Sequence, residues 1–175
     1  MPSADELIRL LHLKPLPREG GWYRETYRSS LHLPADVLAP HYRAARSAGT
    51  AIYYLLTPGT FSALHRLPTD EVFHFYLGDP VEMLQLGPTH EDGGRILTLG
   101  PDIFAGQQVQ TVVPAGVWQG SVLQAGGAFA LLGTTMAPGF DFADYEAADR
   151  DALISAFPDF AERIARLCAS TNSAN

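Results

Sequence analysis

Hydrophobic and polar residues alternate in short runs from about residue 20 to residue 136, and Gly, Pro and Asp separate these runs. Runs of this kind are typical of β-strands. They cover residues 22–28, 50–56, 61–67, 72–77, 81–86, 95–99, 108–113, 116–122 and 128–136. No stretch of about 10 to 15 residues with helical periodicity interrupts them, so parallel βαβ units are not expected. Regular short strands with frequent turns predict an antiparallel sandwich or barrel.

The two ends of the chain show helical patterns instead. Ser3 and Glu6 have the spacing of a capping box and precede a leucine stripe, which predicts a short N-terminal helix. Residues 149–156 and 158–169 predict two short helices near the C-terminus, where apolar residues keep helical spacing. The sequence therefore predicts an all-β barrel with short terminal helices.

The chain has 175 residues and contains no linker, internal repeat or low-complexity block, which favours one domain over residues 1–175. The core of the barrel is expected at about 20–140 and the C-terminal helices at about 149–169. Residues 29–49 are mixed in character and are expected to form a loop or an insertion.

The charge balance argues against several classes of function. Twelve basic and 19 acidic residues give a net charge of −7, and the basic residues are scattered, so nucleic-acid binding is not expected. No apolar stretch is long enough to span a membrane, and the N-terminus lacks the basic region of a signal peptide. The only cysteine, Cys168, excludes an intramolecular disulfide and any cysteine-based zinc cluster. We expect a cytoplasmic location.

Three polar residues interrupt otherwise apolar strands: His65, Glu71 and Gln119. Polar groups in buried strands need hydrogen-bond partners, and the interior of a barrel is a place where several can converge on one ligand. The sequence therefore predicts a small-molecule pocket that contains these three side chains.

These residues belong to two glycine-bounded segments that resemble the two cupin motifs. The first motif matches at Gly59, His65, Glu71 and Gly78, and the second at Gly106, Pro114 and Gly116. Together with the phrases at 19–27, 114–118 and 137–142, they make the chain similar to the fifth cupin group, a subfamily of unknown function. The similarity covers roughly residues 5 to 165. It implies a double-stranded β-helix (jelly-roll) barrel, a homodimer and a ligand pocket in the mouth of the barrel.

The chain departs from the metal-binding members of that superfamily. They supply three histidines and a glutamate, whereas Leu67 and Gln119 occupy two of the four positions here. An amide oxygen is a poor ligand for transition metals, so we expect no cofactor. A weak divalent-metal site of His65, Glu71 and Gln119 is the less favoured alternative. His74 could join it only if a bulge turned its side chain inward.

The residues suit proton transfer without a metal. Some cupin epimerases use a histidine base and a tyrosine acid, although the epimerase fingerprint itself is absent here. This chain offers His65 as the base and Tyr53, on the strand before the first motif, as the acid. The alternative for His65 is a buried ring bonded to a backbone carbonyl. Glu71 would orient His65 or bind ligand hydroxyls, or it would pair with Arg66. Gln119 would offer its amide to a polar ligand.

Further ligand contacts are expected from His74, Tyr23 and Trp118, for which core packing is the alternative. Three functions remain open. The protein could be an isomerase or epimerase acting on a small, sugar-like molecule. It could instead bind a small ligand without turnover, or it could be a weak metal-dependent enzyme.

Overall fold

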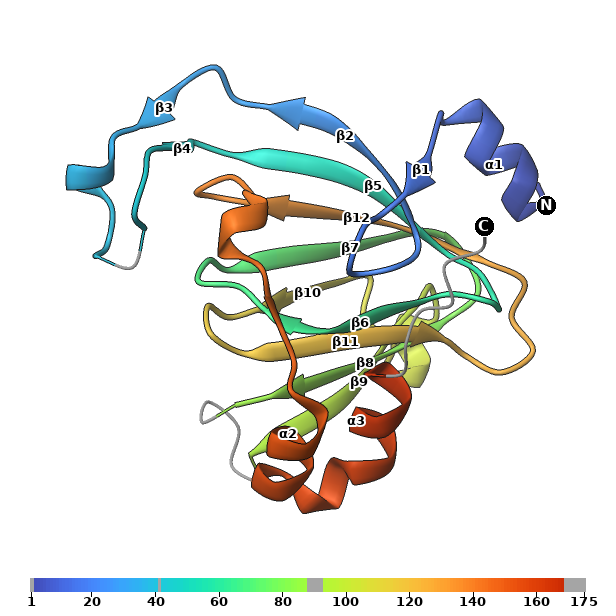
Figure 1. Ribbon diagram of the computed structural model, residues 1–175. Coiled ribbons are helices and arrows are strands. Elements are labelled where there is room, and N and C mark those ends of the chain that lie inside the picture. The colour runs from blue at the N-terminus through green and yellow to red at the C-terminus, as the bar shows by residue number, and fades with distance from the viewer. Residues whose placement is uncertain (1, 41, 88–92, 169–175) are drawn as a thin grey trace.

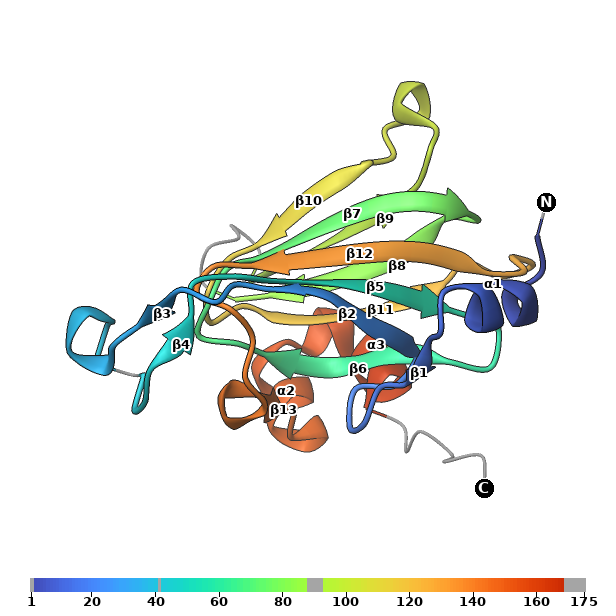
Figure 2. The same ribbon diagram turned by 90° about the horizontal axis from the view of Figure 1, so that it is seen from above.

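The computed structural model describes residues 2–40, 42–87 and 93–168, and two β-sheets that face each other dominate it (Figures 1 and 2). All strand pairs within these sheets are antiparallel. The larger sheet has the order β1 (Lys14–Pro15), β2 (Trp22–Arg28), β5 (Thr50–Leu56), β12 (Ala130–Met136), β7 (Glu71–Gly78) and β10 (Gln110–Val113). The smaller sheet has the order β13 (Glu146–Ala147), β6 (Phe61–Arg66), β11 (Trp118–Leu123), β8 (Val81–Leu86) and β9 (Gly94–Leu99).

The predicted jelly-roll barrel with terminal helices is confirmed. Strands β2, β5 and β8 coincide with the predicted runs, and the other long strands differ from them by one or two residues at one or both ends. The N-terminal helix α1 spans Ala4–Leu10, and its capping box is present, with the Ser3 amide donating to Glu6 at 2.8 Å.

The C-terminal helical region has a turn in its middle. Helix α2 spans Arg150–Ala156, a 3₁₀ turn follows at Pro158–Phe160, and α3 spans Ala161–Leu167. Asp149 caps α2 by accepting from two backbone amides. The prediction placed the end of the last helix at residue 169, which lies outside the described residues.

The segment predicted as a loop or an insertion contains a small hairpin of its own. Strands β3 (His32–Leu33) and β4 (Arg46–Ser47) pair with each other, and a 3₁₀ turn lies between them at Ala35–Val37. In both views this hairpin extends beyond the barrel at one end, and α1 lies at the other (Figures 1 and 2). Two further 3₁₀ turns occur at Ile103–Ala105 and Phe142–Asp144.

The main core lies between the two sheets, and strand alternation explains its composition. In β5, Tyr54 and Leu56 face this core, whereas Leu55 faces the opposite side and packs beneath α1. Both faces of the larger sheet are therefore buried at this strand. On the smaller sheet, outward residues such as Leu84 pack against α2 and α3. Within the described residues no helix is long and apolar enough to cross a membrane.

Candidate functional site

A cavity of about 490 Å³ opens between the inner face of the larger sheet and the turn that follows β12. We call it the inner cavity. Its size falls in the usual range for small-molecule sites. Apolar and aromatic side chains form much of its wall: Leu16, Tyr23, Ile52, Leu67, Met136, Phe140 and Phe142. Lysine, arginine and carboxylate groups share the lining, among them Lys14, Arg28, Glu19 and Glu71.

Two neighbouring strands of the smaller sheet and one strand of the larger sheet bring the predicted polar residues together. His65 on β6 is the register partner of Gln119 on β11, so both side chains lie on one face. Gln119 reaches across to β7, and its Nε2 donates to Glu71 Oε2 at 2.7 Å. His65, Glu71 and Gln119 are all buried, and of these three only Glu71 lines the inner cavity.

The ring of His65 is held in one orientation. Its Nδ1 lies 2.7 Å from the Ala63 carbonyl oxygen, which can only accept, so Nδ1 carries the proton in the neutral ring and Nε2 keeps its lone pair. Tyr145 stacks on the ring with the centroids 4.9 Å apart. Burial lowers the pKa of His65, while the charge of Glu71 acts in the opposite direction. The ring is therefore a neutral potential proton acceptor at physiological pH.

A second carboxyl group, that of Glu19, lies beside this cluster. The backbone carbonyl of Glu19 accepts a hydrogen bond from the Ala63 amide at 2.7 Å, and the side-chain Oε1 accepts one from the Ser62 hydroxyl at 2.9 Å. Burial raises the pKa of Glu19 to about 7. The glycine turn behind it is required for this placement, because a side chain at Gly21 would collide with the ring of Tyr54.

Glu71 responds to the same environment. Burial raises its pKa, and the charge of Glu19 adds to this effect, whereas His65, Thr134 and Gln119 act to lower it. Two carboxyl groups that disfavour each other's ionisation hold protons at a higher pH than isolated ones. The lining of the inner cavity thus contains groups that can donate a proton, with an imidazole behind them that can accept one.

Within the described residues, two buried polar atoms of β11 lack a hydrogen-bond partner: Gln119 Oε1 and Ser121 Oγ. Buried polar atoms are usually paired. The acceptor on Gln119 lies next to the Glu71 carboxyl, so a polar group brought to this point could use it.

The residues present do not fit a transition metal. Among the described side chains, no group of three or more His, Cys, Asp and Glu is placed to hold an ion. Gln119 presents its Nε2 to Glu71, and a –NH₂ group is no metal ligand. Leu67 lines the inner cavity, and its hydrocarbon side chain has no atom that could coordinate a metal.

Tyr53 does not lie in the inner cavity, which corrects the prediction that it would act as the acid. It is on the outer face of the larger sheet, where its ring meets Tyr76 edge-on at 6.1 Å and the Arg24 guanidinium at 5.4 Å. Its neighbour Tyr54 faces inward. The hydroxyl of Tyr54 donates to the Gly20 carbonyl, and burial raises its pKa well above the ordinary value, so it is a poor acid.

His74 and Trp118 also lie outside the cavity. His74 is on the outer face of the larger sheet, hydrogen-bonded to Thr135 and Gln110. A bulge exists in β7, but the register shifts at Tyr76, beyond His74, and therefore does not turn the histidine inward. Trp118 packs on the outer side of the smaller sheet, with Arg66 over its ring at 4.6 Å.

Tyr23, by contrast, lines the inner cavity as expected of a ligand contact. The pairing of Glu71 with Arg66, an alternative from the sequence, is wrong, because Arg66 binds Glu146 with distances of 2.7 and 2.8 Å.

Sequence reasoning missed Glu19 and Tyr145. Glu19 was present in the phrase that carries the family resemblance, but it lies in a turn, where strand periodicity says nothing about direction. Tyr145 precedes the two-residue strand β13, which is too short for a periodic signal.

Two facing sheets of this order, with the residues of both glycine-bounded motifs meeting beside an internal cavity, define a cupin barrel. A family model described as "Cupin superfamily (DUF985)" matches residues 5–148. The chain belongs to this family.

Solved structures agree with this assignment. A hypothetical protein from Leishmania major is similar at 31% identity, with a TM-score of 0.83, over 94% of this chain and 98% of its own. A protein from Shewanella oneidensis is similar at 34% identity, with a TM-score of 0.80, over 95% of this chain and 98% of its own. A cupin 2 conserved barrel domain protein from Rhodopseudomonas palustris shares the fold alone, at 14% identity and a TM-score of 0.57, over 88% and 87%. No match was found among curated proteins.

Proposed function

We propose that this cupin binds a small polar molecule in the inner cavity and moves a proton on it, in the manner of an isomerase or epimerase. One observation carries the proposal: a neutral imidazole of fixed tautomer, His65, is buried beside carboxyl groups whose pKa values are raised. General acid–base catalysis needs a neutral base that can accept a proton and an acid that keeps its proton to a higher pH than an exposed carboxyl group does.

The lining of the inner cavity supports a polyhydroxylated, sugar-like ligand. Both cationic and anionic side chains line it, so no single ligand charge is favoured overall. Arg28 is already engaged by Glu25 at 2.6 Å. The carboxyl groups of Glu19 and Glu71 offer hydrogen-bonding partners for ligand hydroxyl groups. Tyr23 and Phe140 add aromatic surface for the apolar face of a ring.

Binding without turnover is the second candidate, and the position of His65 favours it. The ring is only 1% exposed and is not among the residues that line the inner cavity. In this case Glu71 and Tyr23 would bind the ligand, and His65 would only support Glu71.

The test begins with a thermal-shift screen of aldoses, ketoses and their acids, because a ligand that binds only the native state raises the melting temperature. We expect stabilisation of the wild type by its ligand, loss of stabilisation in Tyr23→Ala, and no loss in Tyr53→Ala, where the ring removed lies on the outer face. Equal effects of the two substitutions, or no stabilising compound, would argue against the inner cavity as the binding site.

The second step distinguishes catalysis from binding. Each stabilising compound is incubated with the protein in D₂O, and NMR follows deuterium incorporation at carbon. We expect exchange with the wild type and with His74→Gln, and at least a 100-fold loss with His65→Gln, since removal of a general base costs about 10²–10⁴ in rate. A compound that stabilises the protein but never exchanges supports binding without turnover.

A further inference from the structure

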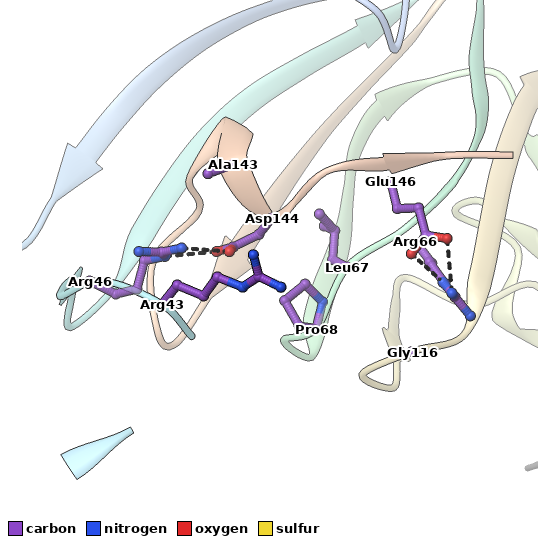
Figure 3. A pocket seen from close by; sticks show the side chains of 9 residues that line it. All are labelled: Arg43, Arg46, Arg66, Leu67, Pro68, Gly116, Ala143, Asp144 and Glu146. Atoms are coloured by element: carbon purple, nitrogen blue, oxygen red, sulfur yellow. Dashed lines mark hydrogen bonds and ion pairs between the residues drawn. The ribbon is translucent and has the colours of Figure 1, made fainter. Parts of the chain in front are cut away.

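A second pocket of about 420 Å³ lies next to the inner cavity, and three arginines are among the residues that line it (Figure 3). We call it the arginine pocket. Arg43 and Arg46 come from the segment around β4, and Arg66 comes from the end of β6. Two carboxylates of the segment before and within β13, Asp144 and Glu146, also line it.

Two of the arginines are already paired. Arg46 makes a bidentate ion pair with Asp144, at 2.8 and 2.5 Å, and both side chains are less than a tenth exposed. Arg66 makes a bidentate pair with Glu146, and both of these side chains are about half exposed. Both carboxylates of the pocket are therefore already paired, each with one of two of its three arginines.

Arg43 is the third cation, and no carboxylate among the described residues pairs with it. Its side chain extends toward Pro68, and its guanidinium is drawn between the two ion pairs (Figure 3). The described side chains of the arginine pocket thus carry one net positive charge, and the cation that supplies it faces the open space.

The remaining wall of the arginine pocket is apolar. Leu67, Pro68 and Ala143 line it, and at Gly116 there is open space, because a Cβ built there would meet nothing within 4 Å. A single negative charge balances the one unpaired cation, and a short hydrocarbon chain suits the apolar wall. A planar carboxylate also matches the guanidinium fork.

We propose that the arginine pocket binds the carboxylate of a small monocarboxylic acid, with Arg43 as the main contact and Leu67 and Pro68 against its hydrocarbon part. The site is distinct from the inner cavity, although Leu67 lines both. The inference does not depend on the proposed function, because none of the groups assigned to proton transfer lines the arginine pocket.

The experiment is an NMR titration of the full chain with acetate, butyrate and inorganic phosphate at constant ionic strength. The arginine Nε–H signals and the Gly116 amide report binding. We expect butyrate to perturb the signals of Arg43 and Gly116 and to bind several-fold more tightly than acetate, because each fully buried methylene strengthens binding by about fourfold.

Three variants sharpen the test. Arg43→Gln should weaken butyrate binding about tenfold, since it removes a charge-assisted hydrogen bond. Arg9→Gln removes the same charge from exposed α1, at the other end of the molecule, and should leave binding unchanged (Figures 1 and 2). Glu146→Gln releases Arg66 and should strengthen binding.

Two results would overturn the proposal. One is the same butyrate affinity in Arg43→Gln and Arg9→Gln. The other is tighter binding of phosphate than of butyrate, which would identify an inorganic oxyanion as the preferred ligand. Because Arg43 is exposed, its variant is expected to fold, and its amide spectrum checks this directly.

Discussion

Glu19 shows how one buried carboxyl group can link stability to pH. The residue lies in a turn that closes over β6, and its carboxylate accepts from Ser62. The raised pKa of about 7 means that the native state favours the protonated form. Folding therefore makes this proton harder to remove. The resulting change in the free energy of unfolding occurs between the ordinary pKa of 4.5 and about pH 7.

This predicts the pH dependence of Glu19→Gln. Below pH 4.5 the carboxyl is protonated in both folded and unfolded states, and above pH 7 it is ionised in both, so the native state loses stability as the pH rises between these values. The amide keeps the acceptor for Ser62 and never ionises. We expect the variant to gain up to about 3 kcal/mol over the wild type between pH 5 and pH 8, measured by urea unfolding.

The control for this measurement is Glu162→Gln, which removes an exposed carboxylate from α3. Its stability relative to the wild type should stay constant to within about 0.5 kcal/mol over the same range. If the difference in unfolding free energy between Glu19→Gln and the wild type does not change with pH, the Glu19 carboxyl titrates like an exposed one and the prediction is wrong.

The limits of sequence reasoning are visible in single side chains. The proximity of His65 to Gln119 could be predicted from the motifs, because both residues lie on well-defined strands. Tyr53 could not be placed, because β5 is apolar on both faces: one faces the core and the other lies under α1. Alternation then separates Tyr53 from Tyr54 but does not say which of them faces inward.

The segments that close the site are the elements least visible in the sequence. Strands β4 and β13 have two residues each, so no periodic pattern marks them. Asp144 lies in a stretch rich in acidic residues, yet its side chain is buried against Arg46. The contact between Arg46 and Asp144 joins residues 98 positions apart and leaves no local signal in the sequence. The strands of the barrel could be predicted from their own periodicity, whereas this contact could not.

The two ion pairs of that closing segment should differ in their effect on stability. The Arg46–Asp144 pair is buried, and removal of one partner leaves an unpaired buried charge, which costs about 3–5 kcal/mol. The Arg66–Glu146 pair is exposed and should contribute less than about 1 kcal/mol. We expect urea unfolding to show a large loss for Asp144→Asn and a small one for Glu146→Gln. Similar losses in the two variants would contradict this assignment of burial.

The molecule as a whole leaves apolar side chains uncovered on the outer face of the larger sheet. Tyr27, Tyr76 and Val112 are 57%, 51% and 44% exposed, and β10 is an edge strand of this sheet. Exposed apolar groups beside an unpaired strand edge favour self-association. The resemblance to dimeric cupins led to the same expectation.

We therefore predict a homodimer that uses this outer face. Light scattering should give a mass of twice 19.0 kDa for the wild type, and Tyr76→Glu should shift the protein toward the monomer at micromolar concentration. Leu10→Glu is the control, because it places a charge on an exposed leucine of α1. A monomeric wild type, or equal dissociation by both variants, would rule out an interface on this face.

The barrel, its helices and its cupin motifs explain why an imidazole, a carboxyl group and an amide meet beside a cavity. The central claim is that this imidazole is a neutral base with a free Nε2. Long-range ¹H–¹⁵N spectra of His65 between pH 5 and 8 test it most directly, with His74→Gln used to assign the signals. We predict protonated Nδ1, unprotonated Nε2 and a midpoint below the ordinary value of 6.5. A ring that carries its proton on Nε2, or that titrates at or above 6.5, would contradict the account.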